Sequence, residues 1–177
     1  IVGSDDAMLP FFSPDGTWVG YFTRSRELRK VPVAGGESTK LTEIPFWASG
    51  AAWRSDGTIA VISDTRGLDS VPDRGGTLAP LGESDTALAR FRFEYPQELR
   101  DGRLLAAVGT GLSTTGPAGL ATLAPGESRW RFVPARGGRG YVELGYLLSR
   151  PAKEMVATRF DLATGQERIA GLSPPND

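Results

Sequence analysis

Charged and aromatic residues alternate in one short stretch of this sequence, RFRFE. Phe91 and Phe93 occupy one set of alternate positions, and Arg90, Arg92 and Glu94 occupy the other. On a β-strand, alternate side chains point to opposite faces, so the phenylalanines would share one face and the charges the other. Two guanidinium groups in a confined site suit a carboxylate or a phosphate. The pattern equally fits a structural strand on which Glu94 pairs with an arginine, and both interpretations stay open.

An aromatic pair, Phe46 and Trp47, is the second candidate binding feature. It lies in a connection between expected strands, where large rings either stack on a ligand or close the core as a packed plug. Arg66 lies in another connection and could add a positive charge. We therefore expect a ligand-binding surface on connecting loops and the mouth of a central channel, formed by Phe46, Trp47, Arg66, Arg90, Arg92 and Glu94.

The sequence contains no Cys and no His. Thiolate nucleophiles, disulfides, zinc–thiolate sites, Ser-His-Asp triads and histidine metal ligands are therefore excluded. An enzyme built from this chain would have to use carboxylates, Tyr, Lys, Arg or a bound metal ion. We predict no catalytic residue, no metal site and no cofactor.

Composition restricts the class of partner. The 177 residues carry a net charge of −1, from 20 basic and 21 acidic side chains, so no overall positive field attracts nucleic acid. No apolar run approaches the roughly 20 residues that span a bilayer, so we expect no membrane insertion by this segment. The 23 Gly and 13 Pro residues favour many short strands joined by tight turns. Because the sequence opens at Ile1 without Met, we expect a processed or excised piece.

A repeat organises the chain. The segment FSPDGT, at 12–17, returns as WRSDGT at 53–58, and LRKVPVAGG, at 28–36, returns as LDSVPDRGG at 68–76. A period of about forty residues, with an aromatic residue, an Asp-Gly turn and a later Gly-Gly turn in each unit, is typical of β-propeller blades. Asp15, Asp56 and Asp101 each precede Gly, and we expect them to hydrogen-bond their own turns rather than to do chemistry. The large aromatic residues are expected to fill the space between blades: Trp18, Phe22, Trp53, Phe91 and Phe93.

The sequence therefore predicts an all-β fold, a β-propeller with four four-stranded antiparallel blades. We expect one domain over 1–177, with blades at about 9–43, 50–83, 89–134 and 140–172, and with the first strand of the third blade at 89–94. Four blades could close a small ring, form part of a larger ring, or pair with a second copy through the terminal blades as a homodimer.

Several segments together resemble TolB-like propeller repeats, and they are most similar to the propeller region C-terminal to the kinase domain of bacterial, eukaryotic-type serine/threonine protein kinases. The segments that carry the resemblance are 10–22 (PFFSPDGTWVGYF), 28–36, 53–59, 95–105, 139–148 and 157–162. No glycine-rich phosphate loop or kinase catalytic loop is present. The resemblance implies a bacterial, kinase-associated module located outside the cytoplasm, in the periplasm or at the cell surface.

These observations favour a non-catalytic sensory or scaffold module that binds a protein or a small molecule, as part of a receptor-like protein. Two alternatives stay open because propellers serve unrelated functions. The first is a propeller enzyme of the lyase, lactonase or glycosidase type. The second is a structural unit that completes a ring by oligomerisation.

Overall fold

The computed structural model describes residues 6–63, 67–83, 88, 91–109, 119–134, 140–143, 146–149, 156–161 and 166–168. Within these ranges the chain is built from strands and turns, and no helix is long and apolar enough to cross a membrane. The strands form four sheets of four strands each. The predicted all-β architecture is therefore confirmed.

Each sheet is a meander in which consecutive strands pair antiparallel, so each is one blade. The strands have the following bounds: blade 1 contains β1 (Met8–Phe12), β2 (Trp18–Phe22), β3 (Glu27–Pro32) and β4 (Thr39–Glu43); blade 2 contains β5 (Ala51–Trp53), β6 (Thr58–Ser63), β7 (Gly67–Pro72) and β8 (Ala79–Leu81); blade 3 contains β9 (Arg92–Glu98), β10 (Leu104–Gly109), β11 (Gly119–Leu123) and β12 (Arg131–Pro134); blade 4 contains β13 (Gly140–Glu143), β14 (Tyr146–Ser149), β15 (Val156–Asp161) and β16 (Gln166–Arg168).

The Asp-Gly turns between the first and second strands have the structural role expected of them. The Asp15 carboxylate accepts hydrogen bonds from the Thr17 amide, at 3.0 Å, and from the Ser13 hydroxyl, at 2.6 Å. These bonds stabilise the charged form and lower the pKa of Asp15 from 3.8 to about 2. Asp56 and Asp101 accept the equivalent amide bond, each at 3.0 Å. The three aspartates therefore close the same turn in three blades.

The core lies between the blades rather than within one of them. On β6, Ile59 and Val61 pack toward blade 1, whereas Ala60 and Ile62 pack toward blade 3. Strand β10 repeats the alternation: Leu104, Ala106 and Val108 join the core shared with blade 2, and Leu105 and Ala107 join the core shared with blade 4. The expected aromatic fillers lie in these cores: Phe22, Trp53 and Phe93 are buried, and Trp18 and Phe91 pack partly buried against them.

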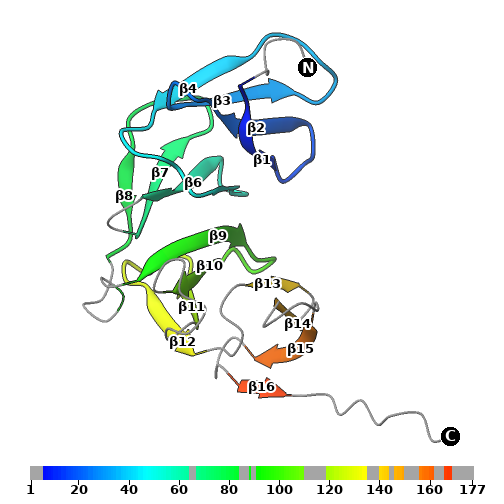
Figure 1. Cartoon of the computed structure of the whole chain (residues 1–177), viewed down its shortest axis with the longest axis vertical. Helices are drawn as coiled ribbons and strands as arrows, with labels where there is room; N and C mark the ends of the chain where they lie inside the picture. Colours follow the sequence, from blue (N-terminus) through cyan, green and yellow to red (C-terminus); the bar gives the residue numbers. More distant parts are fainter. Residues whose placement is uncertain are drawn as a thin grey trace, which may run out of the picture.

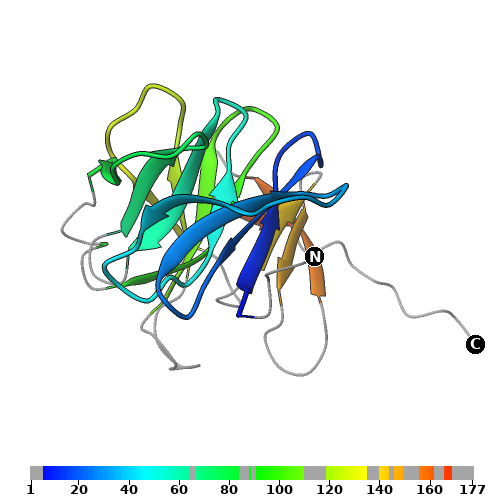
Figure 2. The same cartoon turned by 90° about the horizontal axis from the view of Figure 1, so that it is seen from above.

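The blades follow one another along an arc, with blade 1 at the top of Figure 1 and blade 4 at the bottom. Seen from above, blade 1 lies in front, and the green strands of blades 2 and 3 and the orange strands of blade 4 lie behind it (Figure 2). Contacts between blades run from β1 to β5, from β4 to β7, from β5, β6 and β7 to β9, and from β9 to β13. The first strands of the blades therefore meet one another and form a common inner wall.

One strand differs from its expected position. The first strand of blade 3 was expected at 89–94, but it runs from Arg92 to Glu98. Its pairing with β10 shifts at a β-bulge: Ala107 pairs with Glu94 and Leu105 with Gln97, so two residues of β9 oppose one of β10. The bulge accommodates Pro96, which cannot donate a ladder hydrogen bond, and the strand continues beyond it.

Candidate functional site on the innermost strands

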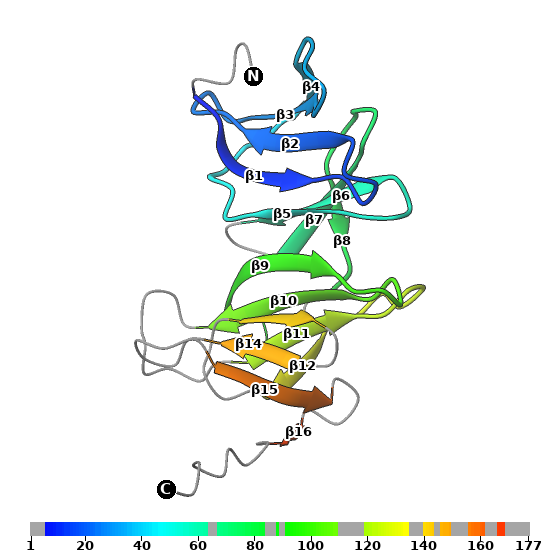
Figure 3. The same cartoon turned by 90° about the vertical axis from the view of Figure 1, so that its right-hand side faces the viewer.

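The first strands of blades 1, 2 and 3 lie side by side and form a single surface. Figure 3 shows β1, β5 and β9 one below another on the face turned to the viewer, and contacts join β1 to β5 and β5 to β9. In a propeller, this surface faces the central channel, where ligands are commonly bound. Its exposed side chains are therefore the first candidates for a binding site.

A residue with positive φ lies at the same position of each repeat, within β1 and β9 and directly before β5. Leu9, Gly50 and Tyr95 have positive φ angles of 50°, 139° and 52°. Each lies three residues before the last residue of the blade's first strand, which is Phe12, Trp53 or Glu98. The repeat therefore includes a left-handed residue on the inner wall of three consecutive blades.

In blades 1 and 3 this residue belongs to a β-bulge with a shared sequence, X-Pro. Met8 pairs with Phe22 and Phe11 with Gly20, so Leu9 and Pro10 together oppose a single residue of β2. Tyr95 and Pro96 oppose β10 in the same way. Such bulges often lie next to binding sites, where they redirect a side chain.

The bulges hold two large side chains away from the core. Leu9 is 45% exposed and Tyr95 is 39% exposed. A non-glycine residue in the left-handed region costs roughly 1–3 kcal/mol, and such residues cluster at functional sites. In blade 2 the position is Gly50, where a Cβ would lie 3.1 Å from Cδ of Pro96. Glycine therefore allows β9 to pack closely on the strand beside it.

The structure separates the two members of the predicted aromatic pair. Phe46 is partly buried and packs against the core between blades 1 and 2, so it acts as the plug. Trp47 is 59% exposed. Both line a small pocket of about 20 Å³ together with Met8 and Leu9. Trp47 and the strained residue of blade 1 therefore belong to one surface.

The alternation expected around Phe93 is present on β9. Phe93 is buried, with its ring edge-on to Trp130 at a centroid distance of 5.5 Å, whereas Arg92 is exposed and Glu94 is half-buried. Arg92 lies three residues before Tyr95, as Trp47 lies three residues before Gly50, so the two occupy equivalent positions in neighbouring blades. Arg66 and Arg90, which complete the predicted set, lie outside the described residues.

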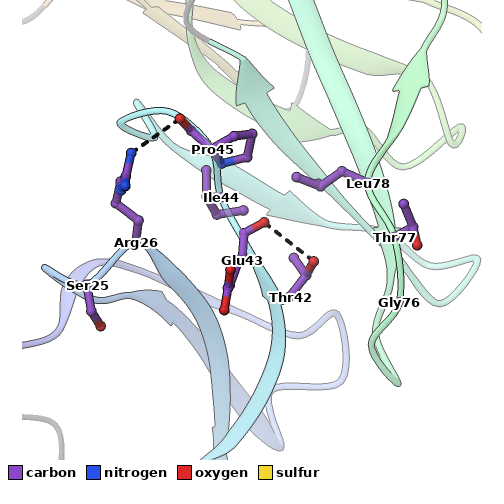
Figure 4. Close-up of a pocket in the computed structure, with 9 residues that line it drawn as sticks. All are labelled: Ser25, Arg26, Thr42, Glu43, Ile44, Pro45, Gly76, Thr77 and Leu78. Atoms are coloured by element: carbon purple, nitrogen blue, oxygen red, sulfur yellow. Dashed lines mark hydrogen bonds between the residues drawn. The ribbon is translucent and has the colours of Figure 1, made fainter.

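A larger pocket, of about 450 Å³, lies elsewhere, between β4 of blade 1 and the segment that leads into β8 of blade 2. Figure 4 shows Ser25 and Arg26 on one side of it and the residues 76–78 on the other. The Arg26 guanidinium donates to the carbonyl oxygen of Pro45 at 3.4 Å. None of the residues predicted from the sequence as a site lines this pocket, which sequence reasoning missed.

Across the described ranges, no three carboxylates gather where they could hold a metal ion.

The inner-wall bulges were also missed by sequence reasoning, although a signal was present. Leu9-Pro10 and Tyr95-Pro96 stand at the same distance before an Asp-Gly turn, so a repeated X-Pro marks the bulge. Blade 2 lacks the proline and has glycine at the left-handed position instead. The signal is therefore visible only when the three repeats are aligned by their turns.

Comparison with proteins of known structure identifies the fold class. No family model matches the chain, and no curated protein matches it. Solved structures do match: regucalcin, a calcium-binding protein from Agrobacterium tumefaciens, has 20% identity and a TM-score of 0.63, and TolB from Acinetobacter baumannii has 15% identity and a TM-score of 0.65. An oligogalacturonate lyase in complex with manganese has 12% identity and a TM-score of 0.65. The fold is that of a β-propeller.

The matches cover nearly all of this chain but only part of each neighbour. The regucalcin match covers 92% of this chain and 58% of that one, the TolB match 92% and 43%, and the lyase match 90% and 51%. The chain therefore spans about half the length of these structures. The neighbours include enzymes as well as TolB, so the likeness establishes the architecture and leaves the activity to be argued from the site.

Proposed function

We propose that this chain is a non-catalytic binding module and that its ligand binds on the inner wall of blades 1 to 3. The observation that carries the proposal is the pair of strained bulges, which hold Leu9 and Tyr95 exposed on one wall, on the two strands that flank β5. Strain of this kind persists where the surrounding structure enforces it, and it is common at ligand sites. Trp47 extends the same surface with an exposed indole.

The chemistry of the surface indicates the class of ligand. Leu9, Trp47 and Tyr95 offer apolar and aromatic area that costs little entropy to order. Arg92 adds a guanidinium, which recognises carboxylates and phosphates by paired hydrogen bonds. The ligand that fits is an aromatic or apolar group that carries a carboxylate or a phosphate, whether on a small molecule or at the surface of a protein partner.

The resemblance to the propeller region of bacterial, eukaryotic-type serine/threonine protein kinases supports a sensory role, in which ligand binding outside the cytoplasm is communicated to an attached domain. An enzyme of the lyase, lactonase or glycosidase type is the competing proposal, supported by the names of the lyase and of a putative gluconolactonase among the structural neighbours. Such an enzyme would use acidic residues or a metal ion, because His and Cys are absent from the sequence.

The test uses phenyl phosphate and benzoate as anionic aromatic probes and benzyl alcohol as their neutral counterpart. Each is titrated into the ¹⁵N-labelled chain, and the amide and indole resonances are followed by NMR. We expect shifts at the Trp47 indole and at the amides of Leu9 and Tyr95. Arg92→Ala should weaken binding of phenyl phosphate at least about tenfold and leave benzyl alcohol almost unchanged, because only the anion uses the guanidinium.

Two matched variants serve as controls. Arg131→Ala removes an exposed arginine from the outer strand β12, and Phe132→Ala removes an exposed aromatic ring from the same strand. Both should bind the probes like the original chain. The proposal is wrong if no probe shifts the inner-wall resonances, or if Trp47→Ala and Tyr95→Ala bind as well as the two controls.

A further inference from the structure

The outer strands of blades 2 and 3 are joined by a short parallel ladder. The Glu83 amide, just beyond β8, donates to the carbonyl oxygen of Ser128 at 2.6 Å, and the Trp130 amide donates to the carbonyl oxygen of Glu83 at 3.1 Å. Glu83 thereby forms a parallel bridge with Arg129. The Trp130 indole fills the junction: it is 1% exposed, and its Nε1 donates to the carbonyl oxygen of Leu81 at 2.8 Å. This junction is therefore closed.

Blades 1 and 2 begin the same ladder without completing it. The Gly76 amide donates to the carbonyl oxygen of Leu41 on β4 at 3.1 Å. Glu43 is the counterpart of Glu83, since each lies two residues beyond the leucine of its blade's fourth strand. Within the described residues, however, no backbone hydrogen bond joins Glu43 to residues 76–78. The two segments therefore separate beyond the first bond.

Two side chains account for this difference between the junctions. Leu78 directly precedes β8 as Trp130 directly precedes β12, so a leucine takes the position at which the closed junction has an indole. Thr42 takes the place of Gly82, where a Cβ would lie 3.0 Å from Nε1 of Trp130. The junction of blades 1 and 2 therefore has a smaller filling side chain, and it has a Cβ where close packing needs none.

The gap between the separated segments is the pocket of about 450 Å³ shown in Figure 4. Ligand pockets usually have volumes of about 300–1,000 Å³. Ile44, Pro45 and Leu78 give this one an apolar part, and Thr42 and Thr77 add hydroxyl groups. Both walls belong to described blades, and a blade packs only on its two neighbours, so blades added beyond blade 1 or blade 4 would not cover the pocket.

Arg26 borders the pocket and forms no ion pair with any described residue. Its guanidinium donates to the carbonyl oxygen of Pro45 at 3.4 Å. Its φ of 63° is a costly conformation of the kind found at functional sites, and the Ile44 amide holds it by donating to the Arg26 carbonyl oxygen at 2.8 Å. The Glu43 carboxylate is already paired with Lys40 at 2.7 Å. The charge that the pocket offers to a ligand is therefore positive.

We propose that this junction pocket binds the C-terminal residue of a peptide or protein partner that ends in a large apolar or aromatic side chain. In this arrangement the side chain packs against Ile44 and Leu78, and the terminal carboxylate pairs with the Arg26 guanidinium by two parallel hydrogen bonds. The backbone of the partner adds to β4 at Glu43, where the ladder to residues 76–78 is missing. The site is separate from the inner wall, and it does not depend on the function proposed there.

The test uses N-acetyltryptophan as the probe, with N-acetyltryptophanamide and N-acetylglycine as its counterparts without the carboxylate and without the ring. Each is titrated into the ¹⁵N-labelled chain and followed by NMR. We expect N-acetyltryptophan to shift the amides of Glu43, Thr77 and Leu78. It should bind at least about tenfold more tightly than either counterpart, because only N-acetyltryptophan supplies both the ring and the carboxylate.

Two variants separate the contributions of charge and space. Arg26→Ala should weaken N-acetyltryptophan at least about tenfold and leave N-acetyltryptophanamide unchanged, whereas Arg131→Ala, the loss of an exposed arginine from β12, should bind like the original chain. The double variant Thr42→Gly/Leu78→Trp gives this junction the side chains of the closed one. It should abolish binding and slow hydrogen exchange of the Glu43 amide, with circular dichroism showing that it is folded.

Arg26 and Ile44 also border the small pocket at Leu9 and Trp47, so the resonances that shift decide between the two sites. Shifts confined to the inner wall would overturn the junction site and leave the inner-wall proposal standing. The junction proposal is equally overturned if Arg26→Ala binds N-acetyltryptophan as tightly as Arg131→Ala does, or if the folded double variant still binds like the original chain.

Discussion

The junction between blades 1 and 2 can be probed with a matched pair of glycine substitutions, Gly75→Ala and Gly35→Ala. The two positions have nearly the same φ, 94° and 91°, so the backbone cost of alanine is about the same at both. That cost is roughly 1–2 kcal/mol for a left-handed L-residue. The difference between the two variants therefore isolates the contact that a Cβ makes.

The contact exists at only one of the two positions. A Cβ at Gly75 would lie 2.9 Å from the Leu41 oxygen, closer than real Cβ atoms approach, whereas a Cβ at Gly35 meets nothing within 4 Å. Relieving the clash must move the turn and weaken the hydrogen bond that the Gly76 amide donates to the Leu41 carbonyl oxygen of blade 1 at 3.1 Å. Such a bond contributes about 1 kcal/mol. Overpacking adds about 1–3 kcal/mol. We expect Gly75→Ala to lower the free energy of unfolding by about 2–4 kcal/mol more than Gly35→Ala does.

The assay is urea denaturation of the two variants and of the unsubstituted chain under the same conditions. Amide hydrogen exchange adds a local reading, because the Gly76 amide should lose protection in Gly75→Ala and keep it in Gly35→Ala. Equal destabilisation by the two substitutions, with unchanged protection of Gly76, would refute the account of the Gly-Gly turn as a close backbone junction.

Three further predictions concern single side chains. Hydrogen bonds hold the pKa of Asp15 at about 2, below its usual 3.8. The ionised Asp15 therefore stabilises the fold fully above pH 3.8, and this contribution is lost as the pH falls through 2. Over that interval, the urea midpoint should depend less steeply on pH in Asp15→Asn than in the original chain. Trp53→Ala should lower the free energy of unfolding by about 3–5 kcal/mol in calorimetry, whereas Phe12→Ala, at the equivalent position of blade 1 but on an exposed ring, should lower it by less than about 1 kcal/mol. Leu9→Gly removes the strain of a left-handed leucine and should raise the free energy of unfolding by up to about 1 kcal/mol, seen as a higher melting temperature. The same variant should bind phenyl phosphate more weakly.

The sequence predicts the blade architecture well because the information is local and repeated. An Asp-Gly turn needs a short side-chain acceptor and a residue with positive φ, and both are visible as letters. The alternation of Phe93 with Arg92 and Glu94 was likewise readable, since a strand has a period of two. Strand pairing within each blade follows from these turns.

The inner wall could not be predicted in the same way. A bulge changes the face on which each following residue lies, and its cause at Tyr95-Pro96 is one proline in a seven-residue strand. The different environments of Phe46 and Trp47 also depend on which ring the core between two blades can accommodate. These features arise from packing between repeats, and no single repeat contains them.

The two-sided strands β6 and β10 have a consequence for how the protein comes apart. Leu105 and Ala107 serve one junction and their neighbours Leu104 and Ala106 serve another, so loss of blade 4 uncovers the first pair and leaves the second packed. The chain therefore behaves as a nearest-neighbour array, whose stability is a sum of blade and junction terms. Unfolding in such an array proceeds inward from the ends, and the resistance of the whole chain to proteolysis is set by the strength of its outermost junctions.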